Sequence, residues 1–446
     1  MDSQIKIINI VIAIFLLIFF IGLILIFEAP LNYILVLCLF FSFVFFYKTK
    51  SLIYLLILIY PLLWLLYDVT TLPSWSGTYF SINMSGILNL GLVILAIPYL
   101  LTRKYRISQY RLLIPIMIFL GIFAMNIFFS QLQLISIRHW FRYAMPAMLY
   151  FIILGTFDEL KETKRLLRFI LCCSFIIPFI FGVWQFVTRD PSFISSGFKR
   201  IYGTFGHPNV YAMFLVLISL LSIYFIFEKS SKYKYLYFCI FICAMISLFF
   251  TFTRVGWASF LVGFSILGFL KFRKFYFLVL LGGVLLLMFL PSFKDTAILR
   301  LQPDSSFWQR FVLNEFGISL FKKKPIFGYG LGNYSLLSTS IGIRNVSQSN
   351  AYGIKTGTSP HNDYIRFLVG GGIVGLLAFL YLMYSAFKLS IKIFESPNLS
   401  VKYYGAFLIS MIAAILIFGI TDQGFEYGGF YFWIFLSSGE IYLNRS

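Results

Sequence analysis

Charged side chains are scarce in this chain, since only 12% of its 446 residues are Asp, Glu, Lys or Arg. A soluble domain carries charge on about a quarter of its residues, so a water-soluble protein of this length is excluded. Hydrophobic residues make up 60% of the chain. They form recurring apolar runs of about 17–25 residues, each long enough to cross a bilayer core as a helix. The sequence therefore predicts an all-α integral membrane protein.

Cysteine and histidine are also scarce. The five cysteines lie inside apolar runs, at Cys38, Cys172, Cys173, Cys239 and Cys243. We interpret them as small buried hydrophobic residues, because no histidine or further cysteine joins them. The three histidines, His139, His207 and His361, are far apart in the sequence, and no acidic cluster completes a metal site.

The apolar runs predict a polytopic bundle of about 12–14 transmembrane helices. The candidate spans cover residues 5–27, 31–47, 51–67, 84–102, 112–129, 141–157, 167–187, 208–227, 235–251, 254–270, 275–291, 364–387, 403–420 and 424–442. They divide the chain into a bundle of about eleven spans (1–291), a long loop (292–362) and about three final spans (363–446).

The net charge of +20 does not indicate nucleic-acid binding, because the basic residues sit in short loops between spans rather than in one patch. Placing both termini in the cytoplasm puts every short basic cluster on the cytoplasmic side, as the positive-inside rule requires. The long loop then lies outside the cell. Within it, residues 307–321 repeat apolar side chains at helical spacing and predict an amphipathic helix that lies on the membrane or packs against the mouth of the bundle.

Two arginines stand out on the predicted external side. Arg254 falls at a tight junction between two apolar spans, where an arginine is costly unless it meets an anion or a wet cavity. The alternative is an arginine that snorkels from a helix end. Arg310 precedes a segment with glycines at Gly328, Gly330 and Gly332. A glycine turn could present amide hydrogens to a phosphate, but without a strand-turn-helix setting it does not indicate NAD or ATP.

His361 lies where the chain re-enters the membrane, in Ser-Pro-His-Asn-Asp-Tyr at residues 359–364. An imidazole there could accept a proton from a sugar hydroxyl. His207, in Gly-Thr-Phe-Gly-His-Pro-Asn at residues 203–209, is more consistent with a structural or substrate-positioning role. Acidic residues lie in loops or at span ends, which argues against an ion-coupled carrier and leaves a flippase with a cationic cavity as an alternative.

These motifs, in this order, resemble the O-antigen ligase and O-antigen polymerase superfamily. The resemblance covers roughly residues 200–380 and rests on the motif at 203–209, Thr-Phe-Thr-Arg at 251–254, Arg310 before Lys-Pro-Ile-Phe-Gly-Tyr-Gly-Leu-Gly-Asn-Tyr, and the motif around His361 with its glycines downstream. Two family features are missing: Asn314 stands where a tryptophan is usual, and Val369 and Gly370 stand near the place of a usual glutamate.

The resemblance implies a metal-independent inverting glycosyltransferase that uses an undecaprenyl-diphosphate-linked glycan and needs no nucleotide cofactor. It implies catalytic roles for His361, Arg254 and Arg310. Guanidinium groups suit a departing diphosphate. We also expect substrate binding by His207, Asn209, Gly328, Gly330, Asn362 and Asp363. Asp363 either orients the imidazole or caps the following helix.

We therefore expect a polysaccharide polymerase in the bacterial cytoplasmic membrane, with its active site on the outer face. Its partners would be the lipid-linked donor, a sugar or lipid-linked acceptor, membrane lipid and other glycan-assembly proteins, but no nucleic acid. The close alternative is a ligase that moves glycan onto a lipid A core or another acceptor. A flippase or transporter of lipid-linked oligosaccharides is the alternative from another class.

Overall fold

A computed structural model describes residues 49–62, 110–157, 159–189, 194–195, 198–228, 232–272, 305–338 and 359–445. The spans predicted at 5–27, 31–47, 84–102 and 275–291 lie outside these residues, and only the first part of the span at 51–67 lies within them.

The described chain is helical, as the composition predicts. The helices are α3 (Thr49–Ile59), α6 (Leu113–Phe128), α7 (Gln133–Thr156), α8 (Leu160–Phe169), α9 (Phe175–Thr188), α10 (Pro208–Ile226), α11 (Lys234–Phe250), α12 (Arg254–Phe272), α15 (Ser305–Lys323), α16 (Tyr334–Leu337), α17 (Asp363–Phe394), α18 (Leu399–Thr421) and α19 (Gly424–Arg445). A 3₁₀ turn at Tyr60–Leu62 follows α3, and a π-helical segment at Ile170–Ser174 joins α8 to α9. Strands β1 (Ile194–Ser195) and β2 (Phe198–Lys199) form a two-stranded antiparallel ribbon, pairing Ile194 with Lys199 and Ser195 with Phe198.

Five helical stretches of the described chain are long and apolar enough to cross a bilayer. They are Leu160–Thr188, Pro208–Ile226, Arg254–Lys271, Asp363–Phe394 and Leu399–Thr421. Two shorter apolar helices, Leu113–Phe128 and Lys234–Phe250, accompany them. The chain is thus an all-α polytopic membrane protein, although the total number of spans stays a prediction.

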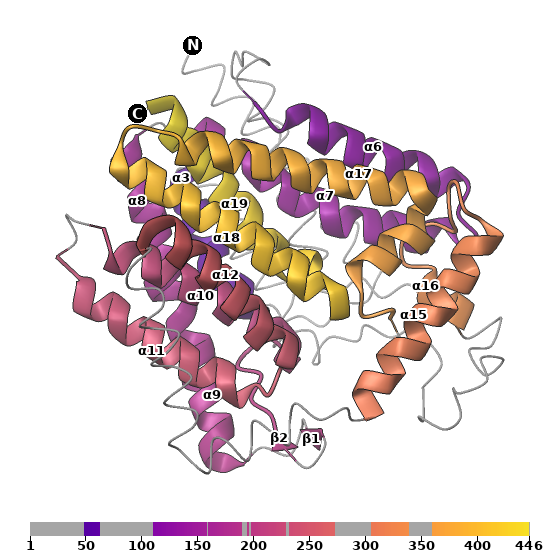
Figure 1. Ribbon diagram of the computed structural model, residues 1–446, viewed down its shortest axis with the longest axis horizontal. Coiled ribbons are helices and arrows are strands. Elements are labelled where there is room, and N and C mark those ends of the chain that lie inside the picture. The colour runs from indigo at the N-terminus through magenta and orange to yellow at the C-terminus, as the bar shows by residue number, and fades with distance from the viewer. Residues whose placement is uncertain are drawn as a thin grey trace, which may run out of the picture.

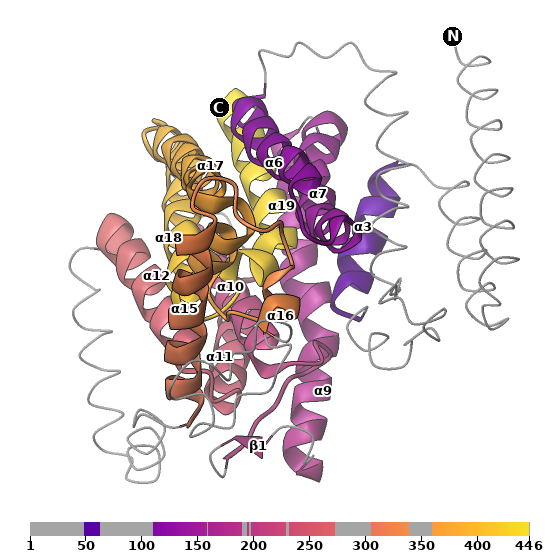
Figure 2. The same cartoon turned by 90° about the vertical axis from the view of Figure 1, so that its right-hand side faces the viewer.

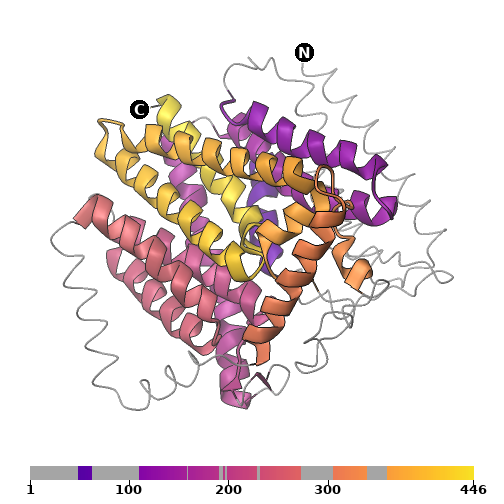
Figure 3. The ribbon, with the colours of Figure 1, turned by 45° about the vertical axis from the view of Figure 1, so that its right-hand side comes forward.

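Helix α18 lies at the centre of the bundle. It packs against α12, α17, α19 and α10, while α19 packs against α7 and α17 packs against α6. Figure 3 shows the result, with α10–α12 on one side, α6 and α7 on the other, and α17–α19 between them. The central α10 is buried along its whole length, whereas the outer α6 exposes Ile114, Met117 and Met125, as a lipid-facing helix should.

The helix ends sort into two opposite faces of the bundle. At one face, Lys164 of α8 contacts both Glu228, after α10, and Ser400 of α18. The other face gathers the start of α17 and the junction between α18 and α19, where the Phe425 amide donates to Asp363. These contacts place the end of α10 and the starts of α8 and α18 together at one face and the starts of α17 and α19 at the other, while the orientation of the two faces in the membrane stays a prediction.

The helix predicted at 307–321 is present as α15. It lies beside the ends of α17 and α18, far from the C-terminus (Figures 1 and 2). Its buried face, formed by Val312, Leu313, Phe316 and Leu320, packs toward α17, whereas Phe311 is 56% exposed. Of the two predicted arrangements, packing at the mouth of the bundle is the one observed.

Helix α17 breaks at Gly372, whose φ of 64° and ψ of −160° interrupt the helical backbone. The break frees peptide groups that a continuous helix would satisfy internally. The segment that follows α15 satisfies several of them, because Tyr329 N donates to Val369 O (2.8 Å) and Ile373 N donates to Pro325 O (2.8 Å). These bonds fix α15 against the end of the bundle where α17 begins.

Candidate active site

His361 lies two residues before the start of α17 and has a left-handed backbone with a φ of 47°. A non-glycine residue in that region is strained, and surrounding structure must hold it there. Its Nδ1 lies 3.3 Å from Oδ1 of Asp422, and its side chain is 28% exposed. The imidazole is thus anchored through Nδ1 and reaches solvent at the mouth of the bundle.

Asp422 lies at the junction between α18 and α19 and is completely buried. Besides His361, its Oδ1 accepts from Gln423 N (3.0 Å), and its Oδ2 accepts from the Asn209 side-chain amide and lies 3.6 Å from Arg310. Burial acts to raise the pKa of Asp422, but the hydrogen bond to His361 and the positive charges of His361 and Arg310 outweigh burial and hold this pKa below its ordinary value. Asp422 is therefore a buried carboxylate to which four parts of the chain converge.

Arg310 reaches this carboxylate from α15, with its side chain 23% exposed. One helical turn later, at the position where the family usually has tryptophan, stands Asn314. The Asn314 Oδ1 is buried and accepts no hydrogen bond from the described residues. Helix α15 thus brings a guanidinium group and an amide oxygen to the same end of the bundle.

Asn209 links Asp422 to a second arginine that the sequence did not single out. The Arg200 guanidinium donates to Asn209 Oδ1 (2.7 Å), to Thr253 Oγ1 (2.8 Å) and to the carbonyl oxygen of Thr251 (2.7 Å). Arg254 begins α12 immediately after Thr253. The backbone of Arg254 therefore lies next to a hydrogen-bond network that runs from Thr253 through Asn209 to the Asp422 carboxylate.

His207 is the N-cap of α10, and its Nδ1 accepts from the Asn209 amide (3.1 Å). Burial lowers the pKa of His207 to about 4; Asp422 acts in the opposite direction, while Arg200, His361 and Arg310 reinforce the lowering. Its imidazole is neutral near pH 7, with one nitrogen occupied by the cap. These contacts agree with the structural or positioning role that the sequence indicated.

Asn362 and Asp363 are both engaged within the fold. The Asn362 side chain caps α17 by accepting from Ile365 N (3.1 Å). The Asp363 carboxylate accepts from the Phe425 amide (2.7 Å), so it binds the start of α19 rather than capping its own helix. Asp422, and not Asp363, contacts the His361 imidazole. Asp363 therefore neither orients the imidazole nor caps α17, which were the two predicted roles.

The glycine segment differs from the expected phosphate cradle. The amide of Gly328 donates to Lys324 O (3.2 Å) and that of Gly330 to Gly370 O (2.8 Å). A Cβ at Gly328 would lie 2.4 Å from Val369 O. The positive φ angles of both glycines thus serve close packing on the broken α17, and these amides are not presented to a ligand.

A second acidic residue, Glu426, organises the neighbouring part of this end. It pairs with Arg366 and with Arg142, whose NH1 lies 2.6 Å from Glu426 Oε1. Arg366 also donates to Tyr143 (3.2 Å) and to Ser359 (3.0 Å), two residues before His361. This network ties α7, α17 and α19 together beside the His361 site.

The structure brings His361 and Arg310 together at Asp422, a residue that the sequence analysis did not single out. Asp422 sits at a tight junction between two apolar spans, which is the same signal that singled out Arg254. That signal could have identified the carboxylate, whereas its pairing with His361 could not be found from a separation of 61 residues. Chemically, the site offers an oriented imidazole beside arginine side chains.

Comparison with known protein families finds one match in this part of the chain. Residues 238–380 match a family model described as O-Antigen ligase. The matched residues include α12, α15 and the first half of α17, and so contain Arg254, Arg310 and His361. The match supports the superfamily that the motifs indicated and a role in polysaccharide biosynthesis. No curated protein matches the chain.

Proposed function

Starting from the O-antigen ligase match at residues 238–380, we propose that this chain is a glycosyltransferase that polymerises lipid-linked repeat units at the outer face of the cytoplasmic membrane. The donor would be a glycan on undecaprenyl diphosphate, and the acceptor a sugar hydroxyl on another lipid-linked unit. The observation that carries the proposal is the convergence of His361 and Arg310 on the buried Asp422, at the end of the bundle away from the basic loops.

The His361 imidazole is the general base. With Nδ1 directed at Asp422, the tautomer that carries its proton on Nδ1 leaves the Nε2 lone pair for the acceptor. As Nε2 takes the proton of the acceptor hydroxyl, positive charge develops on the ring. The ionised Asp422 stabilises this charge, as a carboxylate does behind other catalytic histidines.

The acceptor oxygen attacks the anomeric carbon of the donor while the bond from that carbon to the phosphate oxygen breaks. The diphosphate leaves with the electron pair, and one displacement inverts the configuration. Arg310 and Arg254 are permanently charged and planar, so they suit the negative charge that develops on the leaving group. The amide oxygen of Asn314 could accept a hydrogen bond from a sugar hydroxyl beside Arg310.

A ligase is the second candidate, because the matching family model carries that description. Polymerase and ligase would share the donor and the chemistry at His361, and would differ in the acceptor. The contacts described above concern the donor side and the proton, so they serve both reactions.

The test uses full-length protein in liposomes with a lipid-linked repeat-unit donor. We expect His361→Ala to slow glycan transfer by about 10²–10⁴-fold, which is the usual contribution of a general base. Asp422→Asn should slow transfer as well, because an amide neither selects the Nδ1–H tautomer nor stabilises the imidazolium. Arg310→Lys should also lower the rate, because lysine lacks the planar fork.

Lys322→Gln is the matched control for charge on α15, since Lys322 is exposed in the last turn of that helix. It should transfer glycan at the wild-type rate. Unchanged transfer by folded His361→Ala protein would end the catalytic proposal. Adding a lipid A core acceptor to the same liposomes separates the two candidates, because only a ligase would glycosylate it.

A further inference from the structure

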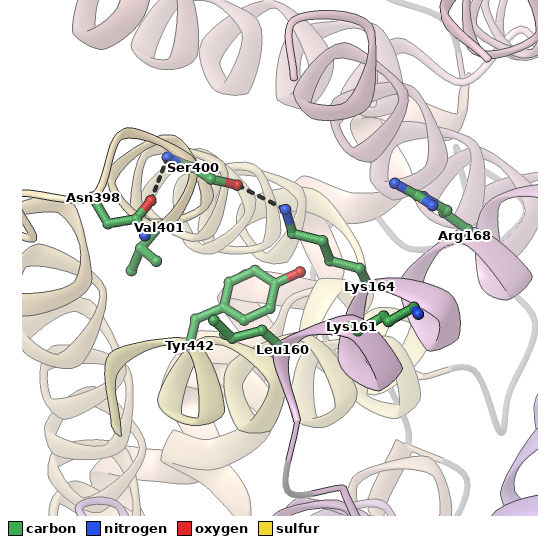
Figure 4. Close-up of a pocket in the computed structure, with 8 residues that line it drawn as sticks. All are labelled: Leu160, Lys161, Lys164, Arg168, Asn398, Ser400, Val401 and Tyr442. Atoms are coloured by element: carbon green, nitrogen blue, oxygen red, sulfur yellow. Dashed lines mark hydrogen bonds between the residues drawn. The ribbon is translucent and has the colours of Figure 1, made fainter. Parts of the chain in front are cut away.

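A cavity of about 280 Å³ lies at the end of the bundle opposite to His361, between α8, α18 and α19. Figure 4 shows its lining, which consists of Leu160, Lys161, Lys164, Arg168, Asn398, Ser400, Val401 and Tyr442. Helix α18 runs from Ser400 at the cavity to Asp422, which places the two sites roughly 33 Å apart along a helix with a rise of 1.5 Å per residue. The cavity is therefore separate from the proposed active site.

Positive charge dominates this cavity. Its lining supplies three cationic side chains, from Lys161, Lys164 and Arg168. One buried carboxylate opposes them: Glu228 pairs with Lys164, and its Oε2 lies 3.7 Å from Arg168. Helices α8 and α18 both begin at the cavity, so the partial positive charge of two helix N-termini adds to this excess.

Two buried donors of the lining residues have no hydrogen-bond partner among the described residues. Tyr442 is 1% exposed, and Figure 4 shows its hydroxyl directed into the space between α8 and α18. This hydroxyl lies near that of Tyr224, but neither forms a hydrogen bond of normal geometry with the described residues. The buried Nε of Arg168 likewise has no hydrogen-bond acceptor among them. Buried donors are normally satisfied. Glu228 Oε2 likewise lacks a hydrogen-bond partner among the described residues and lies 3.7 Å from Arg168, so it is the Tyr442 hydroxyl that indicates an acceptor entering the cavity.

We propose that this cavity binds a phosphate group, and that an anionic phospholipid of the adjacent leaflet presents it. A tetrahedral phosphate accepts several hydrogen bonds at once, which matches the Tyr442 hydroxyl, the Lys164 ammonium, the Arg168 guanidinium and the Ser400 hydroxyl. The basic loops put the cavity at the predicted cytoplasmic leaflet, where anionic lipids concentrate. The bound headgroup would join α8 to α18 and α19.

The experiment measures binding to purified full-length protein in detergent by native mass spectrometry. The probes are dioctanoyl phosphatidylglycerol, dioctanoyl phosphatidylcholine and inorganic phosphate. The variants are Lys164→Gln/Arg168→Gln, which removes two cations, and Tyr442→Phe, which removes one hydroxyl. Lys388→Gln/Lys392→Gln is the matched control. Both lysines are exposed near the C-terminal end of α17, outside the cavity lining, and this variant loses the same two positive charges as Lys164→Gln/Arg168→Gln.

We expect phosphatidylglycerol to bind more tightly than phosphatidylcholine. We expect binding about tenfold weaker in Tyr442→Phe and at least tenfold weaker in the double cation variant, as for hydrogen bonds to charged groups. The control should bind as the wild type does. If inorganic phosphate binds and is weakened by the same variants, while neither lipid binds, the phosphate site is retained and its ligand is a soluble phosphate rather than a lipid headgroup.

The proposal fails if neither phosphatidylglycerol nor inorganic phosphate binds. It also fails if Tyr442→Phe and the control bind phosphatidylglycerol equally well. If the double variant misfolds because Glu228 is left unpaired, Tyr442→Phe still tests the proposal. Glycan transfer is not the readout, so the proposed function and this site can fail independently.

Discussion

At the scale of single residues, Asp422 sets the charge and the geometry of the site. Its carboxylate contacts His361, Arg310 and Asn209, which come from three separate parts of the chain. A buried carboxylate is costly unless it is paired, and here the Arg310 guanidinium, the His361 imidazole and two amide groups share it. Removal of any one partner should therefore change the contacts that the other partners make with Asp422.

His207 provides a pH-dependent prediction at this scale. Burial lowers its pKa to about 4, below the ordinary value of 6.5. A histidine with a lowered pKa stabilises the fold fully above pH 6.5, and this contribution is lost as the pH falls toward 4, because the unfolded chain then binds more protons. The expected loss at pH 5 is roughly 1–2 kcal/mol.

The measurement is thermal unfolding of the purified protein at pH 7 and pH 5, in wild type and in His207→Asn. Asparagine also serves as an N-cap but does not titrate in this range. The wild type should lose more thermal stability than His207→Asn between the two pH values. Equal losses in the two proteins would contradict a buried neutral imidazole.

The sequence indicated some of the site residues but not how they are joined. His361 could be singled out because polar residues at span ends are few, and Arg310 could be singled out through the family resemblance of the segment that follows it. Arg200 could not, because its role depends on its bonds to Asn209 and Thr253, which only the folded helix ends bring together. The glycine segment was misinterpreted, since the same freedom of φ serves ligand approach and tight packing equally well.

At the scale of elements, the break in α17 decides where the site lies. A helix that continued through Gly372 would leave no free carbonyls for the segment after α15. The sequence predicted a span at 364–387 and a separate amphipathic helix. It did not predict that three consecutive glycines open the span to dock that helix, because apolar periodicity carries no information on the backbone angles of glycine.

Gly372→Ala tests this docking. A Cβ there would lie 2.1 Å from the carbonyl oxygen of Ile326, on a backbone with a φ of 64°. We expect a loss of at least about 1–3 kcal/mol from the strained backbone alone, and a larger loss if the clash displaces α15. Glycan transfer should fall as well, because α15 carries Arg310.

Gly121→Ala is the matched control. Gly121 lies within α6, and a Cβ there would meet no atom within 4 Å. Alanine should be neutral or should stabilise the helix by about 0.5–1 kcal/mol. Thermal unfolding and yield of folded protein compare the two variants, and equal stability of both would show that the close approach at Gly372 is not required.

At the scale of the whole molecule, two chemically different ends are held about one bilayer apart. Lys164 and Arg168 lie at one end beside the buried Glu228, while His361, Asp422 and Arg310 lie at the other. This separation could be predicted from the sequence, because each helix reverses the direction of the chain and the loops alternate in charge. The central position of α18 could not, because apolar spans carry no signal for their neighbours in a bundle.

The orientation of the two ends yields the last prediction. Cysteine is introduced one site at a time as Gln131→Cys, at the exposed start of the loop before α7, and as Arg445→Cys, at the exposed end of α19, in a chain whose native cysteines are replaced by serine. Because positive charge is retained in the cytoplasm, a membrane-impermeant maleimide should label Gln131→Cys in intact cells and Arg445→Cys only after permeabilisation. The reverse pattern would place His361 in the cytoplasm, where an acceptor already outside the cell could not reach it, and the proposed polymerisation at the outer face would be wrong.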